Sequence, residues 1–143
     1  MLRLSKKVDY AIILLSHLGE ASGPISAQEM SSHYHLPQPM IANILKQLAA
    51  SQLVESTRGV QGGYVLQRQT GQISLAEIVR IMDGPFNFVE CAHGASECCV
   101  SATCPTRVPL QALHKRLYEF MDSVTLESLM QRRALQPVWS EKD

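Results

Sequence analysis

The chain has 143 residues, 45% of them hydrophobic, with 13 basic and 13 acidic side chains. This length and composition fit a single folded domain, and the balanced charge excludes a broad basic surface as the means of binding nucleic acid. The longest purely apolar run, from Tyr10 to Leu15, is far shorter than a membrane span, so no membrane association is expected.

The first residues, MLRLSKK, lack the apolar region and the small-residue cleavage site of a signal peptide. A cytoplasmic protein is therefore expected, and cytoplasmic thiols stay reduced. All four cysteines lie in one stretch, CAHGASECCVSATC, which begins at Cys91 and ends at Cys104. A reducing compartment argues against a disulfide framework here, although an even number of cysteines would permit one.

Two helices are expected at the start of the chain. Ser5 can cap the first, SKKVDYAIILLSHLGEA, which is apolar on more than one side and so indicates contact with a second subunit. Gly23-Pro24 interrupts the chain, and Ser26 with Glu29 then forms a capping-box pattern that opens a short second helix.

A third helix is expected after Leu36-Pro37, where the second must end. Pro39 suits its first turn. Its apolar residues repeat at helical spacing and form a buried stripe of Ile41, Ile44, Leu45 and Leu48. Two helices joined by a tight turn, the second of them amphipathic, predict a helix-turn-helix.

A β-hairpin is expected next. The stretches Leu53–Ser56 and Tyr64–Leu66 favour strands, and the segment Arg58–Gly63 between them holds three glycines. A helix-turn-helix followed by a hairpin is a winged helix. Residues 1–84 are therefore predicted to form a winged helix-turn-helix DNA-binding domain.

Two further helices are expected on either side of the cysteines. Ser74 and Glu77 form a second capping-box pattern, which opens a helix that ends at Asp83-Gly84-Pro85. After the cysteines, PLQALHKRLYEFMDSV carries apolar residues at helical spacing: Leu110, Leu113, Leu117, Phe120 or Met121, and Val124. One apolar stripe on a long helix at the edge of a small domain needs a partner, so a homodimer is expected.

The predicted fold class is mainly α with a small β-hairpin wing. A winged helix-turn-helix is expected to carry a long C-terminal dimerisation helix. After the DNA-binding domain, the expected parts are a cysteine-rich cluster-binding loop over residues 85–105, dimerisation helices over 106–130 and a tail over 131–143.

The outward face of the third helix and the tip of the wing are the predicted contacts with double-stranded DNA. Asn and Gln side chains can pair with an adenine edge, and Lys reaches guanine or phosphate. An Arg at the wing tip suits a narrow minor groove, and a Gln at the start of the helix can donate to phosphate. The predicted contacts are Gln38, Met40, Asn43, Lys46, Gln47 and Arg58. Taken singly, each of them could equally be an ordinary solvated residue.

Three interpretations of the cysteines compete. They could be buried small hydrophobic residues, partners in a switchable disulfide between Cys98-Cys99 and Cys91 or Cys104, or ligands of one metal centre. The paired C-x-x-C knuckles of a structural zinc site are absent. The long spacers between Cys91, Cys98 and Cys104 suit an iron–sulfur cluster.

The pattern leaves a fourth ligand open. The candidates near or within the loop are Glu90, His93 and His114, and those from a partner subunit are Asp9, His33 and His35. A thiol oxidoreductase is disfavoured, because no C-x-x-C motif and no arrangement of a nucleophile with its base is present.

The segments KVDYAIILLSHLG, RGVQGGYVL and ISLAEIVRIMDGP, followed by the cysteine loop, resemble the Rrf-type (IscR- and NsrR-like) winged-helix transcription regulators. The resemblance covers roughly residues 1–125 and is closest to regulators of SUF iron–sulfur assembly genes. It implies a homodimeric regulator, not an enzyme, whose cysteines hold a 2Fe–2S or 4Fe–4S cluster. Some members of this family are instead cluster-free repressors that respond to thiol oxidation or to a small molecule.

The resemblance also implies ligands. Cys91, Cys98 and Cys104 match the three cysteine positions, with Cys99 a possible substitute for Cys98. Arg107 stands where IscR-like members place a histidine, and Asp9 matches the carboxylate that NsrR-like members supply from the partner's first helix.

Overall fold

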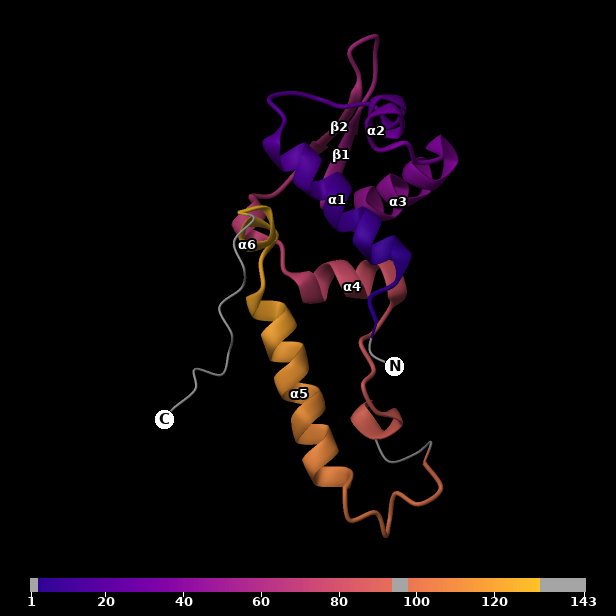
Figure 1. Cartoon of the computed structure of the whole chain (residues 1–143), viewed down its shortest axis with the longest axis vertical. Helices are drawn as coiled ribbons and strands as arrows, with labels where there is room; N and C mark the ends of the chain where they lie inside the picture. The colour runs from indigo at the N-terminus through magenta and orange to yellow at the C-terminus, as the bar shows by residue number, and fades with distance from the viewer. Residues whose placement is uncertain (1–2, 94–97, 132–143) are drawn as a thin grey trace.

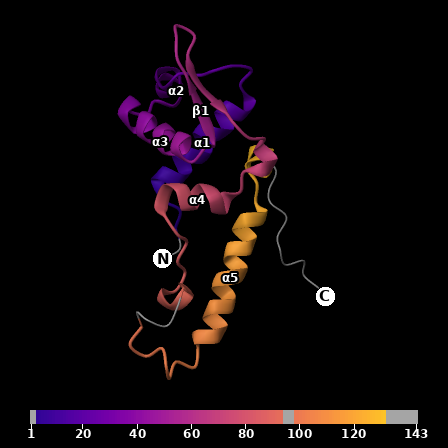
Figure 2. The same cartoon turned by 180° about the vertical axis from the view of Figure 1, so that it is seen from behind.

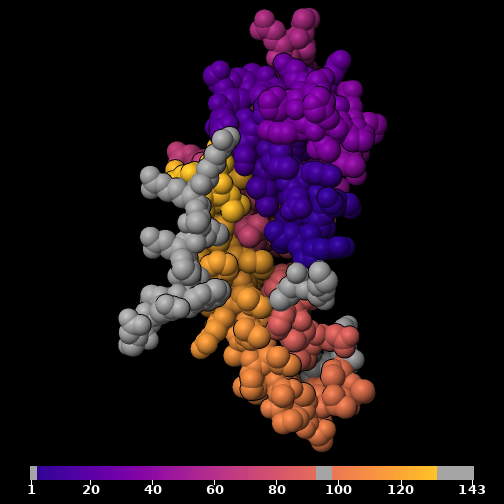
Figure 3. Space-filling view, in the orientation of Figure 1, coloured from indigo at the N-terminus to yellow at the C-terminus, as the bar shows by residue number. Residues whose placement is uncertain are grey.

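The computed structural model describes residues 3–93 and 98–131 and is elongated, with a winged-helix unit at one end and the cysteine segment at the other (Figure 1). In space-filling view, α5 (Arg107–Ser123) and the cysteine segment extend well beyond that unit (Figure 3). Within the described ranges, no helix is long and apolar enough to cross a membrane. The expected tail lies outside these residues apart from Gln131.

The first two helices begin at the predicted caps. In α1 (Lys6–Glu20), the Ser5 hydroxyl accepts a hydrogen bond from the backbone N–H of Val8. In α2 (Ala27–Tyr34), Ser26 and Glu29 form the complete capping box. Each cap satisfies backbone donors that a helix start leaves unpaired.

The helix α3 (Gln38–Ala50) turns its predicted stripe inward, and this stripe joins one continuous core. The winged-helix unit therefore rests on apolar contacts among α1, α2, α3, the hairpin, α4 (Leu75–Asp83) and α6 (Leu126–Met130). Ile13 of α1 stays outside the core and is 37% exposed. The buried core residues are Val8, Ala11, Leu14, Leu15, Leu18, Met30, Ile41, Ile44, Leu45, Leu48, Leu53, Val54, Ile73, Ile78, Val79, Met82 and Leu126.

The wing is a two-stranded antiparallel hairpin of β1 (Val54–Thr57) and β2 (Gly63–Leu66). The strands were expected one residue earlier on the first arm and one residue later on the second. The difference arises at the hairpin neck, where the Thr57 hydroxyl accepts from the Gly63 N–H and donates to the Gly63 carbonyl. These two bonds extend the pairing toward the tip.

The two adjacent glycines of the wing are required by close backbone approach. A Cβ atom on Gly62 would collide with the carbonyl oxygen of Thr57, and one on Gly63 would lie 2.5 Å from the carbonyl carbon of Ile25. Ile25 and Tyr64 exchange two backbone hydrogen bonds of 3.1 and 2.8 Å, which attach the wing to the segment between α1 and α2. The Gly-Gly pair therefore fixes the direction in which the wing projects.

The helix α4 begins at Ser74, but only half of the predicted capping box forms. The Ser74 hydroxyl accepts from the backbone N–H of Glu77, as expected. The Glu77 carboxylate turns instead to the Arg68 guanidinium, 2.6 Å away. A charged partner from the strand–helix connection thus displaces the weaker return bond to the backbone. Gly84, at φ +86°, ends the helix.

The chain then leaves the core through the short 3-10 helix η2 (Glu90–His93) and returns along α5. Both the front view and the view from behind show the first turns of α5 far from the core (Figure 2). None of the residues of α5 is buried, and Leu113 and Phe120 are each 41% exposed. The predicted apolar stripe is therefore present but only partly covered in one chain: Val124 is buried, whereas Leu113 and Phe120 are exposed.

After α5, the chain returns to the winged-helix core and is held there by α6, a helix that the sequence analysis did not predict separately. Thr125 and Ser128 form a capping box, and Leu126 is fully buried. The Leu126 N–H donates to the Ile73 carbonyl and the Leu75 N–H to the Val124 carbonyl, both at 2.8 Å. An antiparallel bridge thus ties the end of α5 to the start of α4.

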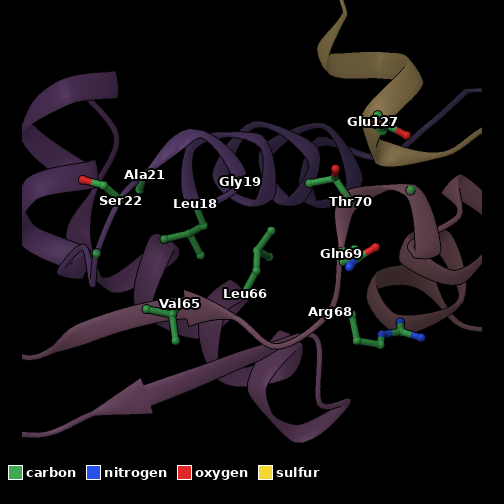
Figure 4. A pocket seen from close by; sticks show the side chains of 12 residues that line it. Leu18, Gly19, Ala21, Ser22, Val65, Leu66, Arg68, Gln69, Thr70 and Glu127 are labelled. Carbon is green, nitrogen blue, oxygen red and sulfur yellow. The ribbon is translucent and has the colours of Figure 1, made fainter.

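A cavity of about 570 Å³ lies where this returning segment meets α1 and the 3-10 helix η1 (Thr70–Gln72). Leu18 of α1, Leu66 of β2 and Glu127 of α6 surround it (Figure 4). A Cβ atom on Gly19 would lie 2.9 Å from the Thr70 methyl and 3.1 Å from the Met130 methyl. The absence of a side chain at Gly19 therefore lets α1, η1 and α6 approach one another.

We predict that Gly63→Ala lowers the free energy of unfolding by about 1–3 kcal/mol, because its Cβ collides with the Ile25 backbone, which has no free end to move aside. Thermal and urea unfolding would measure the change. Gly23→Ala is the matched control, since its Cβ meets nothing within 4 Å and its unfolding free energy should change by less than about 0.5 kcal/mol. Equal stability of the two variants would contradict the proposed role of Gly63.

Candidate nucleic-acid interface and cysteine segment

The outward face of α3 carries the residues expected there. Asn43 and Lys46 are exposed, Met40 is 39% exposed, and Gln47 is only partly exposed. Gln38 is exposed at the first position of the helix. These five side chains form a single surface, because the stripe on the opposite side of the helix is buried in the core.

Arg58 is exposed where β1 ends, and the hairpin projects past α2 at the end of the molecule farthest from the cysteine segment (Figure 1). The side chains of Asn43, Lys46, Gln47 and Arg58 have no hydrogen bond or ion pair to another described residue. Their donors and acceptors are thus available to a ligand, as base and phosphate contacts require.

Val60 is a wing residue that the sequence reasoning missed. It stands at the hairpin tip, fully exposed at 107% relative accessibility. Its side chain therefore lies outside the core and is open to solvent. The sequence feature that could have identified this residue is an apolar valine between the glycines of RGVQGGY, where the hairpin tip is expected.

The four cysteines are unpaired thiols. Cys91, on η2, and Cys98 and Cys104 are partly exposed, whereas Cys99 is exposed. The interpretation of these residues as buried small hydrophobic side chains is therefore wrong. The polar composition of the loop explains this, because Gly, Ser and Thr neighbours offer little apolar surface to cover the sulfur atoms.

Side chains of α5 hold both described arms of the cysteine segment. The Gln111 amide donates to the Cys91 carbonyl at 2.7 Å, and the Arg107 guanidinium donates to the Ser101 carbonyl at 3.5 Å. Arg107, at the position where a histidine ligand was considered, thus has a positioning role. A change in the conformation of the segment would therefore act directly on the first turns of α5.

Cys104 is the thiol with the most favourable setting for a thiolate. The Thr106 hydroxyl, 3.4 Å from its Sγ atom, lowers the pKa of Cys104 by stabilising the charged form, and the nearby Arg107 adds a smaller effect in the same direction. The thiolate is the form that binds metals and reacts with oxidants. The position is therefore suited to either chemistry.

The donor set fits an iron–sulfur cluster in kind, since three partly exposed thiols lie on one segment. Over residues 3–93 and 98–131, however, no group of three or more Cys, His, Asp or Glu side chains is close enough to hold a metal ion. Residues 94–97, within the loop, lie outside the described residues. Binding of a cluster to this segment requires it to draw the three sulfur atoms together.

The candidates for a fourth ligand differ in their contacts and in their exposure to solvent. His114 accepts a bond from the Phe88 N–H at 3.3 Å and stacks on Phe86, with ring centroids 5.3 Å apart. His33 packs against His17 and Tyr34, with centroids 5.0 and 4.7 Å away. The remaining candidates are His35, which ends α2 at φ +53°; Glu90 and Asp9, which are exposed; and His93, whose side chain lies outside the described set.

Comparison with known proteins places these features in a family. Residues 4–132 match the Rrf2 family, described as iron-dependent transcriptional regulators. The regulator IscR of Xenorhabdus nematophila is 27% identical over 144 residues, covering 99% of this chain and 87% of the relative.

Solved structures give the same result. B. subtilis CymR, a global cysteine regulator, superposes with a TM-score of 0.74 at 26% identity, covering 94% of this chain and 100% of CymR. T. potens IscR superposes with a TM-score of 0.69 at 25% identity, covering 94% and 93% of the two chains. The predicted fold class is confirmed. The family match, the winged helix-turn-helix and the free polar face of α3 together show that the chain belongs to the Rrf2 family of DNA-binding transcriptional regulators, which are not enzymes.

Proposed function

We propose that this protein is a cytoplasmic homodimer that binds a pseudo-palindromic operator and adjusts its occupancy to the supply of iron–sulfur clusters. Its targets would be genes for cluster assembly of the SUF type. The observation that carries the proposal is the position of the cysteine segment between α4 and α5. α4 packs in the core that holds α3, and the segment after α5 is bridged to the start of α4.

Cys91, Cys98 and Cys104 would hold the cluster, of either the 2Fe–2S or the 4Fe–4S type. Cys99 is a possible substitute for Cys98, since the two are adjacent. Asp9 is exposed on α1 and belongs to no group of donors in its own chain, among the described residues, that could hold a metal ion, so we place its role as ligand across the dimer. When bound, the cluster supplies a bridge between the arms of the loop that depends on iron, sulfide and redox state.

The residues of this chain would carry the signal from loop to DNA. Drawing Cys91 toward Cys104 pulls on η2 and on the first turn of α5, which Gln111 and Arg107 connect to the segment. The far end of α5 is fixed to α4, and α4 packs on α1 and α3. A differential stabilisation of a few kcal/mol between the two loop states is enough to switch operator occupancy.

The proposed dimer uses the uncovered stripe of α5. Leu113 and Phe120 lie seven residues apart on one side of the helix. A groove of about 390 Å³ beside them is lined by Leu4, Leu117 and Met121. Twofold pairing would cover this surface on both chains and set the spacing between the two α3 helices.

A second candidate function is a cluster-free repressor that responds to thiol oxidation. The structural likeness to CymR and the separation of the three thiols favour it. In this case the lowered pKa of Cys104 marks it as the reactive thiol, with Cys98 or Cys99 as its disulfide partner. Both functions place the signal in the same segment.

We predict that Asn43→Ala and Gln47→Ala each weaken operator binding roughly tenfold, about 1–3 kcal/mol per lost base contact. Fluorescence anisotropy at fixed salt, with an operator obtained by in vitro selection, would measure this. Gln72→Ala, on the exposed η1 that packs against α6, is the matched control and should bind normally. Unchanged binding by both α3 variants would exclude this face as the DNA-reading surface.

We predict that anaerobic reconstitution with iron and sulfide gives visible absorbance that Cys91→Ala, Cys98→Ala and Cys104→Ala each abolish. Cys99→Ala should retain it, because Cys99 is the more exposed member of the adjacent pair. A colourless wild-type protein would exclude the cluster. If mild oxidation then yields a disulfide linked through Cys98 or Cys99, detected by mass spectrometry, the cluster-free repressor becomes the correct function.

We predict that the double variant Leu113→Asp/Phe120→Asp is monomeric, because two charges would enter the centre of an apolar interface. Sedimentation velocity would measure the mass. Lys115→Asp, two residues and roughly 200° further around the helix from Leu113, should remain dimeric. A dimeric double variant with native helical content would place the interface elsewhere.

A further inference from the structure

A cavity beside the cysteine segment has no part in the function proposed above. Its volume is about 590 Å³, and it lies between the end of α4, the turn that follows, η2 and α5. Figures 1 and 2 show these segments facing one another at the lower half of the molecule. This volume is in the range of pockets that hold small organic ligands.

The charge of its lining favours an anion. Arg80 and Lys115 reach it from α4 and α5, and none of the residues that line it is acidic. Arg80 is exposed and has no ion pair within the described part of the chain. Lys115 meets Glu119 at 3.7 Å, with both side chains largely exposed, so that pair is weak.

The walls favour a flat, aromatic ligand. Phe86 and His114 stack with an interplanar angle of 18°, and Tyr118 adds a third ring to the lining. Ring faces of this kind pack well against a planar ligand. Gln111 also lines the cavity and already donates to the Cys91 carbonyl, so an occupant touches the residue that positions the cysteine arm.

Part of the cavity wall lies away from the proposed dimer surface. Gln111 and Tyr118 are each two residues, roughly 200°, around the helix from Leu113 and Phe120. On the other side, Pro85 and Phe86 line both the cavity and the groove beside the apolar stripe, so these two residues border both surfaces.

We propose that this cavity is an effector site for a small planar aromatic anion, held by Arg80 and Lys115 at its acidic group and by the Phe86–His114 stack at its ring. Arg80, Lys115 and Phe86 are not among the candidate cluster ligands. Because Ala92 of η2 belongs to the lining, occupancy restrains the arm that carries Cys91.

The test uses the full-length protein and anilinonaphthalene sulfonate, a fluorescent anion with a flat naphthalene ring system, with the uncharged phenylnaphthylamine as its neutral analogue. The expected result is saturable binding of the sulfonate that Arg80→Gln and Lys115→Gln each weaken about fivefold, with the neutral analogue bound less tightly. Arg116→Gln removes the same charge from an exposed α5 residue that does not line the cavity, and it should bind like the wild type.

Circular dichroism melting of the variants checks that the fold is retained, and the exposure of Lys115 makes its variant the safest of the set. Three outcomes would overturn the proposal. They are no saturable binding to the wild type, equal weakening by Arg116→Gln, and equal affinity for the neutral analogue.

Discussion

The bridge between Ser74 and Thr125 is the contact on which the rest of the structure depends. It joins the start of α4 to the residue that follows α5, and Leu126 next to it is fully buried in the winged-helix core. The part of the chain between Ser74 and Thr125, which includes the cysteine segment, therefore begins and ends at this bridge. Without this closure, α5 would be a free arm. With it, the chain on both sides of the cysteine segment is anchored to the body that holds α3.

The core connects the two attachment points, at α4 and α6, to α3 and the wing. α1 contacts α3, α4, α6 and β2, so it touches the helix of the predicted DNA contacts, the wing and both attachment points. Its inward residues, such as Leu14 and Leu15, are completely buried. Close-packed interiors shift as units and do not deform smoothly. In the function proposed here, a displacement at the attachments would be passed to the predicted DNA-contacting surface as a change in the position of α3 and the wing.

The cysteine segment combines accessible sulfur with firm support on both sides. The thiols are partly exposed, yet the Cys91 and Ser101 carbonyls are held by side chains of α5. This arrangement suits either of the two proposed signals, because each requires the sulfur atoms to move together while the ends remain attached.

The sequence by itself determined the elements whose causes are local. The caps at Ser5 and Ser26, the buried stripe of α3 and the glycine-rich wing depend on residues a few positions apart, and the winged helix follows from their order. Clustering of the cysteines and the polar face of α3 likewise identified the candidate sites. Only the tertiary structure decided that Glu77 pairs with Arg68 and that Leu126 returns to the core. These are contacts between residues distant in the chain, and neither periodicity nor capping patterns carry information about which distant surfaces meet.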